Sequence, residues 1–114
     1  YIIRYKKEIF HNIKREIFFK AMQAEGVYTY KGWSPLYKEP LFSINPKEYP
    51  WLENIDYNGL FHDNTEAFAQ EQAVWLRQNH LIGTDNDLQD IINAFEKVAT
   101  EMRKNPNKFK NIIT

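Results

Sequence analysis

The side chains in this sequence that could bind a ligand directly are large aromatics in a proline-rich stretch. They are Trp33, Tyr37, Trp51 and Tyr57. Pro35 and Pro40 fix the local backbone and keep this stretch extended rather than helical. Rings held in this way could stack on sugar rings, fill an interface or simply cover the core. Tyr37 lies between the two prolines and carries a phenol that needs a hydrogen-bond partner, so it is the first candidate for a binding residue.

The sequence contains no established metal-binding or catalytic spacing. Its three histidines are His11, His62 and His80. His62 and Asp63 with Glu66 three residues on do not form a known ligand pattern, and a helix cap explains the acids. Acids that could serve glycoside hydrolysis are Glu39, Glu48, Glu53 and Asp56. Any acidic loop offers as many, and neither a nucleophile elbow nor a glycine-rich phosphate loop is present. We therefore assign no catalytic, cofactor-binding or metal-binding residue.

The first thirty residues predict a strand, a helix and a second strand. Tyr1 to Tyr5 is β-branched and aromatic, which favours a strand. Apolar residues then recur at helical spacing, which predicts a helix from about Ile13 to about Glu25. Asn12 is a suitable N-cap for this helix, and Gly26 is a suitable residue just beyond its C-terminus. Val27 to Tyr30 is again rich in strand-forming residues and predicts the second strand.

The middle of the chain predicts a long ordered loop, a short helix and a third strand. From Trp33 to about Gly59 no period is sustained and prolines recur. Asp63 and Glu66 have the spacing of a capping box, in which Asp63 accepts from the helix backbone and Glu66 reaches back. A short helix is expected from Asn64 to about Gln72, and the apolar run from Ala73 to Leu76 predicts the strand.

The clearest amphipathic pattern lies in the last third of the chain. Thr84 or Asp85 would cap a helix that Pro106 would close, and the polar tail from Asn105 to Asn111 should fray. We predict one α+β domain over residues 1–104, with residues 105–114 as a polar C-terminal tail. It would be a small α/β sandwich with about three strands in a mixed or antiparallel sheet and the helices on one face.

Composition excludes several classes of function. The chain has 114 residues, enough for one modest core, with 15 basic and 15 acidic side chains. Zero net charge argues against a nucleic-acid or membrane partner. Cysteine is absent, and no apolar run reaches the roughly 20 residues of a membrane span. We expect a cytoplasmic protein. We also expect that the chain is part of a longer one, because it opens without Met on what reads as a strand already in progress.

Four stretches in series resemble the C-terminal part of the DegT/StrS aminotransferases. They are A-E-G-V from Ala24, Y-K-G-W-S-P-L-Y-K-E-P-L-F from Tyr30, T-E-A-F-A-Q-E-Q-A-V-W-L from Thr65 and N-H-L-I-G-T-D-N-D-L-Q-D-I from Asn79. The resemblance covers nearly the whole chain in the same order. The P-L-Y form of the loop and the A-V-W-L run look most like the branch that includes scyllo-inosose aminotransferases.

The resemblance implies one domain of an enzyme. The family aminates keto-sugars and cyclitol ketones with pyridoxal phosphate (PLP), using an amino-acid donor such as glutamine or glutamate. Its cofactor site lies in a large domain, which would stand upstream of Tyr1, so this chain alone should be inert. The small domain forms one wall of the substrate cleft, where the resemblance assigns substrate binding to Tyr37, Trp33 and Ser34. Family members are dimers, so we expect a homodimer in the parent protein, with part of the aromatic surface covered.

Two departures from the family pattern leave loop geometry and substrate choice open. His62-Asp63 stands where relatives commonly have Cys-Pro, and Arg77 follows Trp75-Leu76 where they often have proline. Each change trades a rigid residue for a charged one.

The alternative from a different class is a non-catalytic carbohydrate-binding or regulatory interaction module, which would use the aromatic loop directly.

Overall fold

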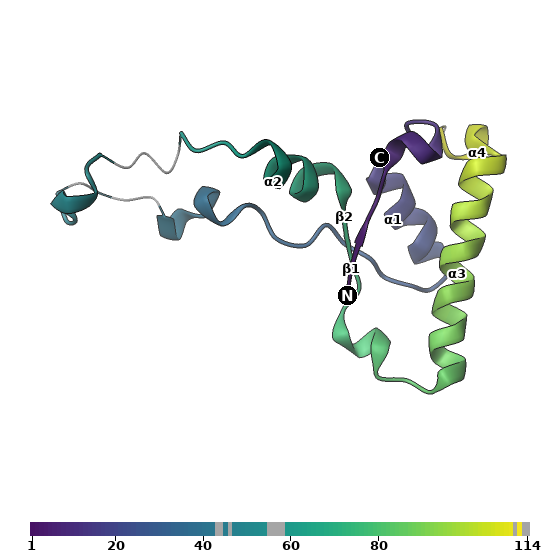
Figure 1. The fold of residues 1–114 in the computed structure, drawn as a ribbon. Coiled ribbons are helices and arrows are strands. Elements are labelled where there is room, and N and C mark those ends of the chain that lie inside the picture. The colour runs from purple at the N-terminus through teal and green to yellow at the C-terminus, as the bar shows by residue number, and fades with distance from the viewer. Residues whose placement is uncertain (43–44, 46, 55–58, 111, 113–114) are drawn as a thin grey trace.

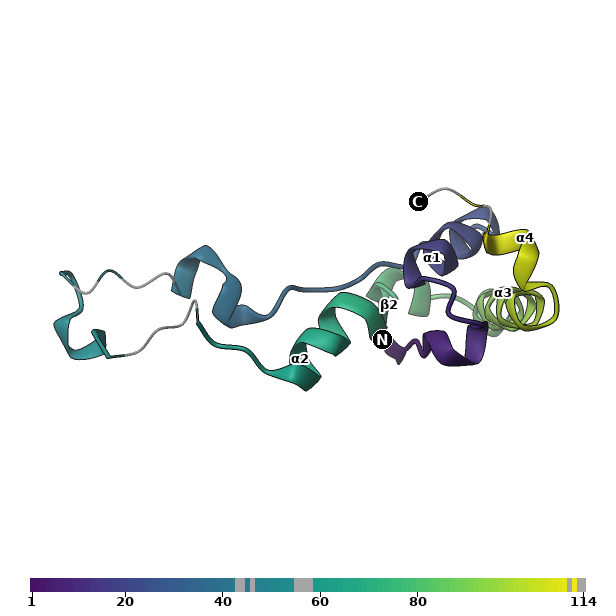
Figure 2. The same cartoon turned by 90° about the horizontal axis from the view of Figure 1, so that it is seen from above.

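The molecule consists of a helical body on a small sheet and an arm that projects from it (Figure 1). The computed structural model describes residues 1–42, 45, 47–54, 59–110 and 112. The molecule measures 55 × 34 × 21 Å, and the arm extends far beyond the body in the view from above (Figure 2). The first strand, β1, and the last helix, α4, both lie in the body, so the arm is an excursion from the middle of the chain (Figure 1).

Two of the predicted strands are present as β1 (Ile2–Arg4) and β2 (Ala73–Trp75), and they pair with each other in an antiparallel sheet where the arm joins the body (Figure 1). Ile3 lies opposite Val74 in the register. Because side chains alternate along a strand, Ile3 and Val74 face the core, while Arg4 and Trp75 face the other way. The sheet therefore has one apolar face available for helix packing.

The strand predicted over Val27–Tyr30 is reduced to one antiparallel bridge between Tyr30 and Trp75. Val27 is buried in the core and donates its backbone N–H to the Met22 carbonyl at 2.9 Å. The chain therefore stays with the preceding helix and reaches β2 only at Tyr30. The α+β class is confirmed with a two-stranded sheet, and the predicted third strand is not formed within the described residues.

Helix α1 (Arg15–Ala24) ends as predicted, in a left-handed turn at Gly26 with φ of 83°. The N–H of Gly26 bonds to the Gln23 carbonyl and the N–H of Val27 to the Met22 carbonyl, which is a Schellman motif. The predicted N-cap was wrong. Asn12 has a left-handed backbone with φ of 59°, and the helix begins later, after the extended residue Lys14.

Helix α3 (Asp85–Lys104) begins at the predicted cap, Thr84. The Thr84 hydroxyl accepts from the Asp87 N–H, and the Asp87 carboxylate accepts from the Thr84 N–H, which satisfies two exposed donors. The Thr84 bonds hold the pKa of the Asp87 carboxyl below its ordinary value. Where a frayed tail was predicted, the short helix α4 (Pro106–Lys110) follows, and Phe109 packs against the core.

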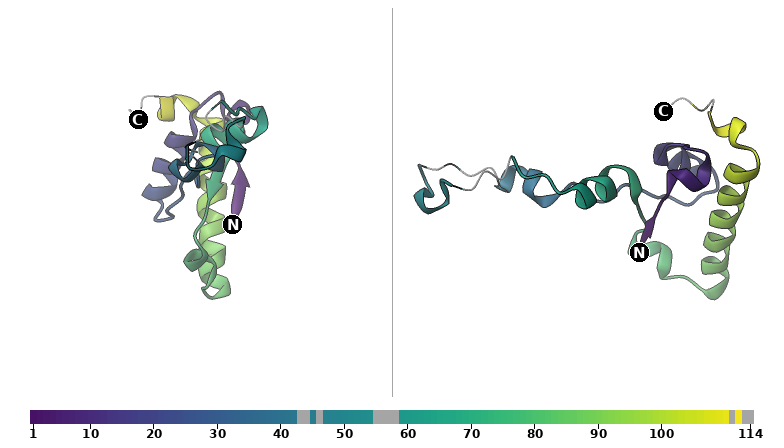
Figure 3. Two further views of the ribbon diagram at one scale, coloured as in Figure 1. Left: turned by 90° about the vertical axis from the view of Figure 1, so that its left-hand side faces the viewer. Right: turned by 45° about the horizontal axis from the view of Figure 1, so that its top comes forward.

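The core lies between the apolar face of the sheet and the two longer helices. Helix α1 lies between β1 and α3 (Figures 1 and 3). Met22 of α1 and Met102 of α3 are fully buried, and the Phe18 and Phe95 rings meet with centroids 5.8 Å apart. The predicted placement of the main helices on one face of the sheet therefore holds for α1 and α3.

The arm consists of short helical turns in the described residues, with two stretches running side by side (Figures 1 and 2). Tight turns at Leu36–Lys38, Pro40–Phe42 and Pro50–Leu52 lie along it. The chain returns through α2 (Asp63–Ala67), which continues into a π-helical turn, Phe68–Gln72, and then into β2. Pro46, Asp56 and Tyr57, which belong to the predicted loop and its ligand candidates, lie outside the described residues.

Candidate functional site

An open cleft of about 390 Å³ lies where the arm leaves the body, between the loop of residues 31–39 and the helical segment of residues 66–70. Polar and aromatic side chains line it, among them Lys31, Trp33, Ser34, Lys38, Glu39 and Glu66. Two of the three predicted substrate residues, Trp33 and Ser34, thus come together here. Trp33 is 75% exposed, so its indole is available to a ligand.

Glu66 is the buried acid of this cleft, with 4% of its surface exposed. Its Oε1 accepts from the Tyr37 hydroxyl at 2.7 Å and pairs with the Lys38 ammonium at 2.6 Å, and its Oε2 accepts from Gln70 Nε2 at 2.5 Å. The Lys38 ammonium above all, and then the Tyr37 hydroxyl, hold the pKa of this carboxyl below its ordinary value. Glu66 therefore fastens the loop to the returning helix as a carboxylate.

These contacts take the place of the capping box predicted for Asp63 and Glu66, which was wrong. Helix α2 begins at Asp63, and its N-cap residue, His62, makes no side-chain cap bond. Instead of reaching back to the cap, Glu66 bonds to residues 28 and 29 positions earlier in the chain. Partners this far apart in the sequence leave no local pattern that could indicate the contact.

Tyr37, the third predicted substrate residue, stands beside the cleft and is not among the residues that line it. Its hydroxyl donates to Glu66, and its ring meets that of His62 edge-on with centroids 5.3 Å apart. Burial, and then the bond to Glu66, raise the pKa of this phenol. In this structure the hydrogen-bond partner that the half-buried phenol needs lies within the chain itself.

Arg15, which falls outside the apolar stripe of its helix, is buried and holds the base of the arm against the body. It is 3% exposed. Its guanidinium donates to the carbonyls of Ala69 and Ala73 at 3.0 Å and of Gln70 at 2.6 Å, and it lies over the Phe19 ring. A guanidinium with several planar donors suits this task, because the end of the π-helical turn leaves carbonyls without helical partners.

Gly32 sets the approach of the loop to the body. Its φ is 77°, and a Cβ at this position would overlap the indole of Trp75 on the outer face of β2. The backbone can therefore cross the indole only at a glycine. Because Gly32 immediately precedes Trp33, this crossing also determines where the aromatic wall of the cleft begins.

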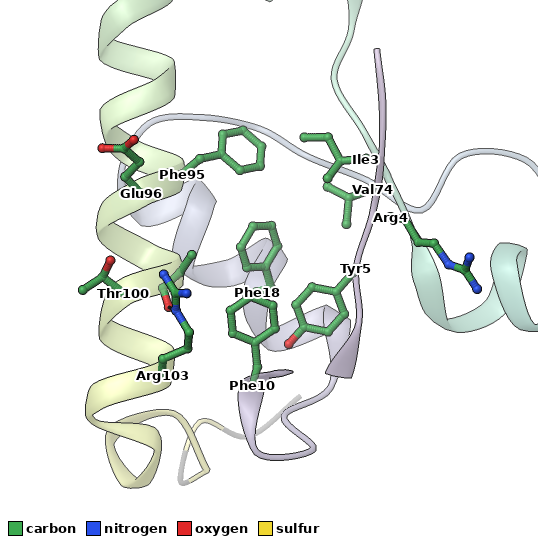
Figure 4. A pocket seen from close by; sticks show the side chains of 11 residues that line it. Ile3, Arg4, Tyr5, Phe10, Phe18, Val74, Phe95, Glu96, Thr100 and Arg103 are labelled. Atoms are coloured by element: carbon green, nitrogen blue, oxygen red, sulfur yellow. Dashed lines mark hydrogen bonds between the residues drawn. The ribbon is translucent and has the colours of Figure 1, made fainter. Parts of the chain in front are cut away.

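A second hollow, of about 510 Å³, opens between β1 and α3 (Figure 4). Figure 4 shows the rings of Phe10, Phe18, Phe95 and Tyr5 around it, with Arg103 at its α3 side. The Tyr5 hydroxyl already donates to the Ile13 carbonyl at 2.9 Å, and burial raises its pKa. The hollow offers an apolar surface but few free polar groups, so it is a weaker candidate for a polar ligand.

The remaining candidates do not form a site together. Trp51 lies far out on the arm, 74% exposed, edge-on to Tyr49. Glu48 and Glu53 are also on the arm, away from Glu39 in the cleft. His11 contacts the Arg103 carbonyl at 3.0 Å. Among the described residues, no three metal-ligating side chains come together, and no helix is long and apolar enough to cross a membrane.

Sequence comparison relates the chain to part of several aminotransferases. It is 27% identical over 109 residues to a protein of Micromonospora echinospora, covering 89% of this chain and 26% of that protein. Proteins of Streptomyces kanamyceticus and Streptoalloteichus tenebrarius are 24% and 26% identical over 90% and 85% of the chain. All three are provisionally assigned as L-glutamine:3-amino-2,3-dideoxy-scyllo-inosose aminotransferases.

The chain is similar to one region of an aminotransferase. It spans about a quarter of the length of each of these relatives. No family model matches it, and no solved structure does. The similarity therefore relates the chain to a region of aminotransferases and leaves the activity of the whole protein, its family and its substrate to a proposal.

Proposed function

We propose that this chain is the small C-terminal domain of a PLP-dependent aminotransferase of the DegT/StrS type. The parent protein would transfer an amino group from glutamine or glutamate to a keto-sugar or cyclitol ketone. The observation that carries the proposal is the alignment of 85–90% of the chain with a quarter of each of three aminotransferases. The order of the four family-like stretches along the chain supports it.

The chain's part in this function would be to form one wall of the ketone site. The exposed Trp33 indole offers a flat apolar face to a ring, and Ser34 a hydroxyl. Tyr37 would contribute from beside the cleft, either to the ketone or by holding the wall through Glu66. Polar side chains around the flat face of the Trp33 indole suit a ligand with a polyhydroxylated ring.

PLP supplies the electron sink of such a reaction when bound, and it requires a lysine, an acid at the ring nitrogen and phosphate donors. The cleft does not fit it. Lys38 is held as an ion pair with Glu66, and Lys31 lies on the exposed loop. We therefore place the cofactor in an upstream large domain. That domain and a homodimer partner in the cytoplasm would cover the exposed apolar side chains of the arm, such as Leu36, Leu41 and Trp51.

The test is a comparison of the intact protein with two truncations. The intact protein should aminate a cyclitol ketone with glutamine as donor. A variant that ends just before Tyr1, and so lacks this chain, should lose this activity. The isolated chain of 114 residues should neither transaminate nor develop the visible absorbance of bound PLP. Activity or lysine-linked PLP in the isolated chain would contradict the proposal.

The second candidate is a carbohydrate-binding or regulatory module, which the exposed Trp33 at a polar cleft favours. It requires saturable sugar binding by the chain itself. Titration with sugars, followed by tryptophan fluorescence, separates the two candidates. Binding that is lost in both Trp33→Ala and Tyr37→Ala would support the module, whereas absence of binding would support the enzyme domain.

A further inference from the structure

Within the part of the chain that the structure describes, the charged side chains that line the cleft pair with one another except for two. Glu16 accepts from the buried Arg15, and Lys38 pairs with Glu66. Lys31 and Glu39 also line the cleft, and neither makes an ion pair or a side-chain hydrogen bond with any described residue. As far as the described residues go, the cleft thus presents one cation and one carboxylate without a side-chain partner.

The half-buried Glu39 is the stronger of these two recognition groups. Its loop position is fixed by the backbone bond from its N–H to the Leu36 carbonyl at 3.0 Å and by the adjacent Lys38–Glu66 ion pair. An ionised carboxylate only accepts hydrogen bonds, so the ligand group that suits it best is a cationic donor. A primary ammonium beside the Trp33 indole would satisfy this requirement and would also face an aromatic ring.

We propose that Glu39 binds the amino substituent of an amino-cyclitol ketone and thereby selects it over the corresponding hydroxyl compound. This inference rests on the proposed function. It is consistent with the names of the three relatives, in which the acceptor carries a 3-amino group. Lys31, on the same cleft, donates to a hydroxyl oxygen carried by the ring of the ligand, since an ammonium has only donors to offer.

The other two acids of the cleft are less suited to this role. Glu66 already receives bonds from Tyr37, Lys38 and Gln70, so a ligand ammonium would have to displace one of them. Glu16 is bonded to Arg15 at 3.2 Å. Glu39 has no such bond to any residue that the structure describes, so it has none of these to give up.

The experiment uses the intact PLP-loaded protein and two ketones that differ only in an amino or a hydroxyl group. In Glu39→Gln, kcat/KM for the amino ketone should fall about tenfold or more relative to the hydroxyl ketone, because one charge-assisted bond is lost. Calorimetry with an amino-cyclitol that lacks the ketone should show a similar loss of affinity. Glu8→Gln makes the same chemical change at an exposed site outside the cleft and should leave the ratio as in the wild type.

Three outcomes would overturn the inference. Equal losses for the two ketones, or unchanged calorimetric affinity, would remove Glu39 from recognition of the amino group. A raised KM for glutamine, with the ketone ratio unchanged, would assign the carboxylate to the ammonium of the donor instead. If the wild-type protein consumed neither ketone, the proposed function itself would fail, which is a different result from any of these.

Discussion

At the scale of single residues, Glu66 connects two segments that are distant in the sequence. Its pKa is lowered from the ordinary 4.5 by Lys38 and Tyr37, so its contribution is complete above the unfolded value and is lost as pH falls through the folded one. We predict that the bonds to Tyr37 and Lys38 persist at neutral pH and break only below pH 4.5. The carboxyl carbon signal of Glu66, followed by NMR as pH is lowered, gives the midpoint.

Substitution of Glu66 should change the pKa of the Tyr37 phenol in a direction that follows from the loss of their hydrogen bond. In Glu66→Gln the charged acceptor is gone, so the pKa of the Tyr37 phenol should fall toward its ordinary value, though not fully, because burial is the larger cause of its rise. Titration of the Tyr37 ring signals measures this. Glu8→Gln is the matched control. A midpoint above pH 4.5 for Glu66, or an unchanged phenol pKa, would show that the contact is not formed in solution.

Two glycines with similar backbone angles separate the effects of conformation and contact. Gly26 has φ of 83° with no atom near its missing Cβ, whereas Gly32 has φ of 77° and lies against Trp75. Gly26→Ala should cost about 1–2 kcal/mol for the left-handed backbone alone. Gly32→Ala should cost about 1–3 kcal/mol more, because the added methyl displaces the indole.

Urea denaturation of the two alanine variants would measure the difference. The Trp75 indole signal should shift in Gly32→Ala and stay in place in Gly26→Ala, since only the first change touches the ring. Equal losses of stability would mean that the loop does not cross the indole as described.

At the scale of elements, α1 and the π-helical turn are joined by the guanidinium of Arg15. Arg15→Met keeps the length of the side chain but leaves the carbonyls of Ala69, Gln70 and Ala73 without these donors. We predict a loss of about 3 kcal/mol or more, because three charge-assisted bonds are lost and one of the acceptors, the Ala73 carbonyl, is buried. Arg15→Lys should lie between Met and wild type, since it keeps the charge but not the planar donors.

Denaturation midpoints would order these three proteins. Hydrogen exchange would test the location of the effect, because amides of Phe68–Gln72 should lose protection in Arg15→Met while those at the far end of α3 should not. Loss of protection spread evenly over both helices would argue against a specific role in holding the turn.

Elements with a local signal could be predicted from the sequence, and those that depend on distant partners could not. Thr84 and Asp87 cap α3 through atoms three residues apart, and Gly26 ends α1 within its own turn. The burial of Arg15 and of Glu66 depends on segments brought together only by the fold. The strand expected at Val27 does not form because the Val27 side chain is buried in the core, and Tyr30 alone pairs with Trp75 of β2.

The candidate site was predicted in part for the same reason. Trp33 and Ser34 share a short stretch of loop, so their common location in the cleft follows from the sequence once the loop is recognised. The facing side of the cleft comes from residues 66–70, whose position no local pattern reveals. Lys31 and Glu39 were missed as a pair, because what distinguishes them is that neither has a side-chain partner among the described residues, which only the folded chain displays.

At the scale of the whole molecule, the arm divides the sequence into two halves that are nevertheless interleaved. β1 and α1 precede it, and β2 and α3 follow it, yet β1 pairs with β2 and α1 packs on α3. Chymotrypsin should cut beside the exposed Tyr49 or Trp51 of the arm well before it reaches the buried aromatics of the core. The two peptides should then elute together in native gel filtration and separate only in denaturant. The body would in that case be a non-covalent complex of two fragments that are joined only through the arm. The two halves, expressed separately and mixed, should then associate.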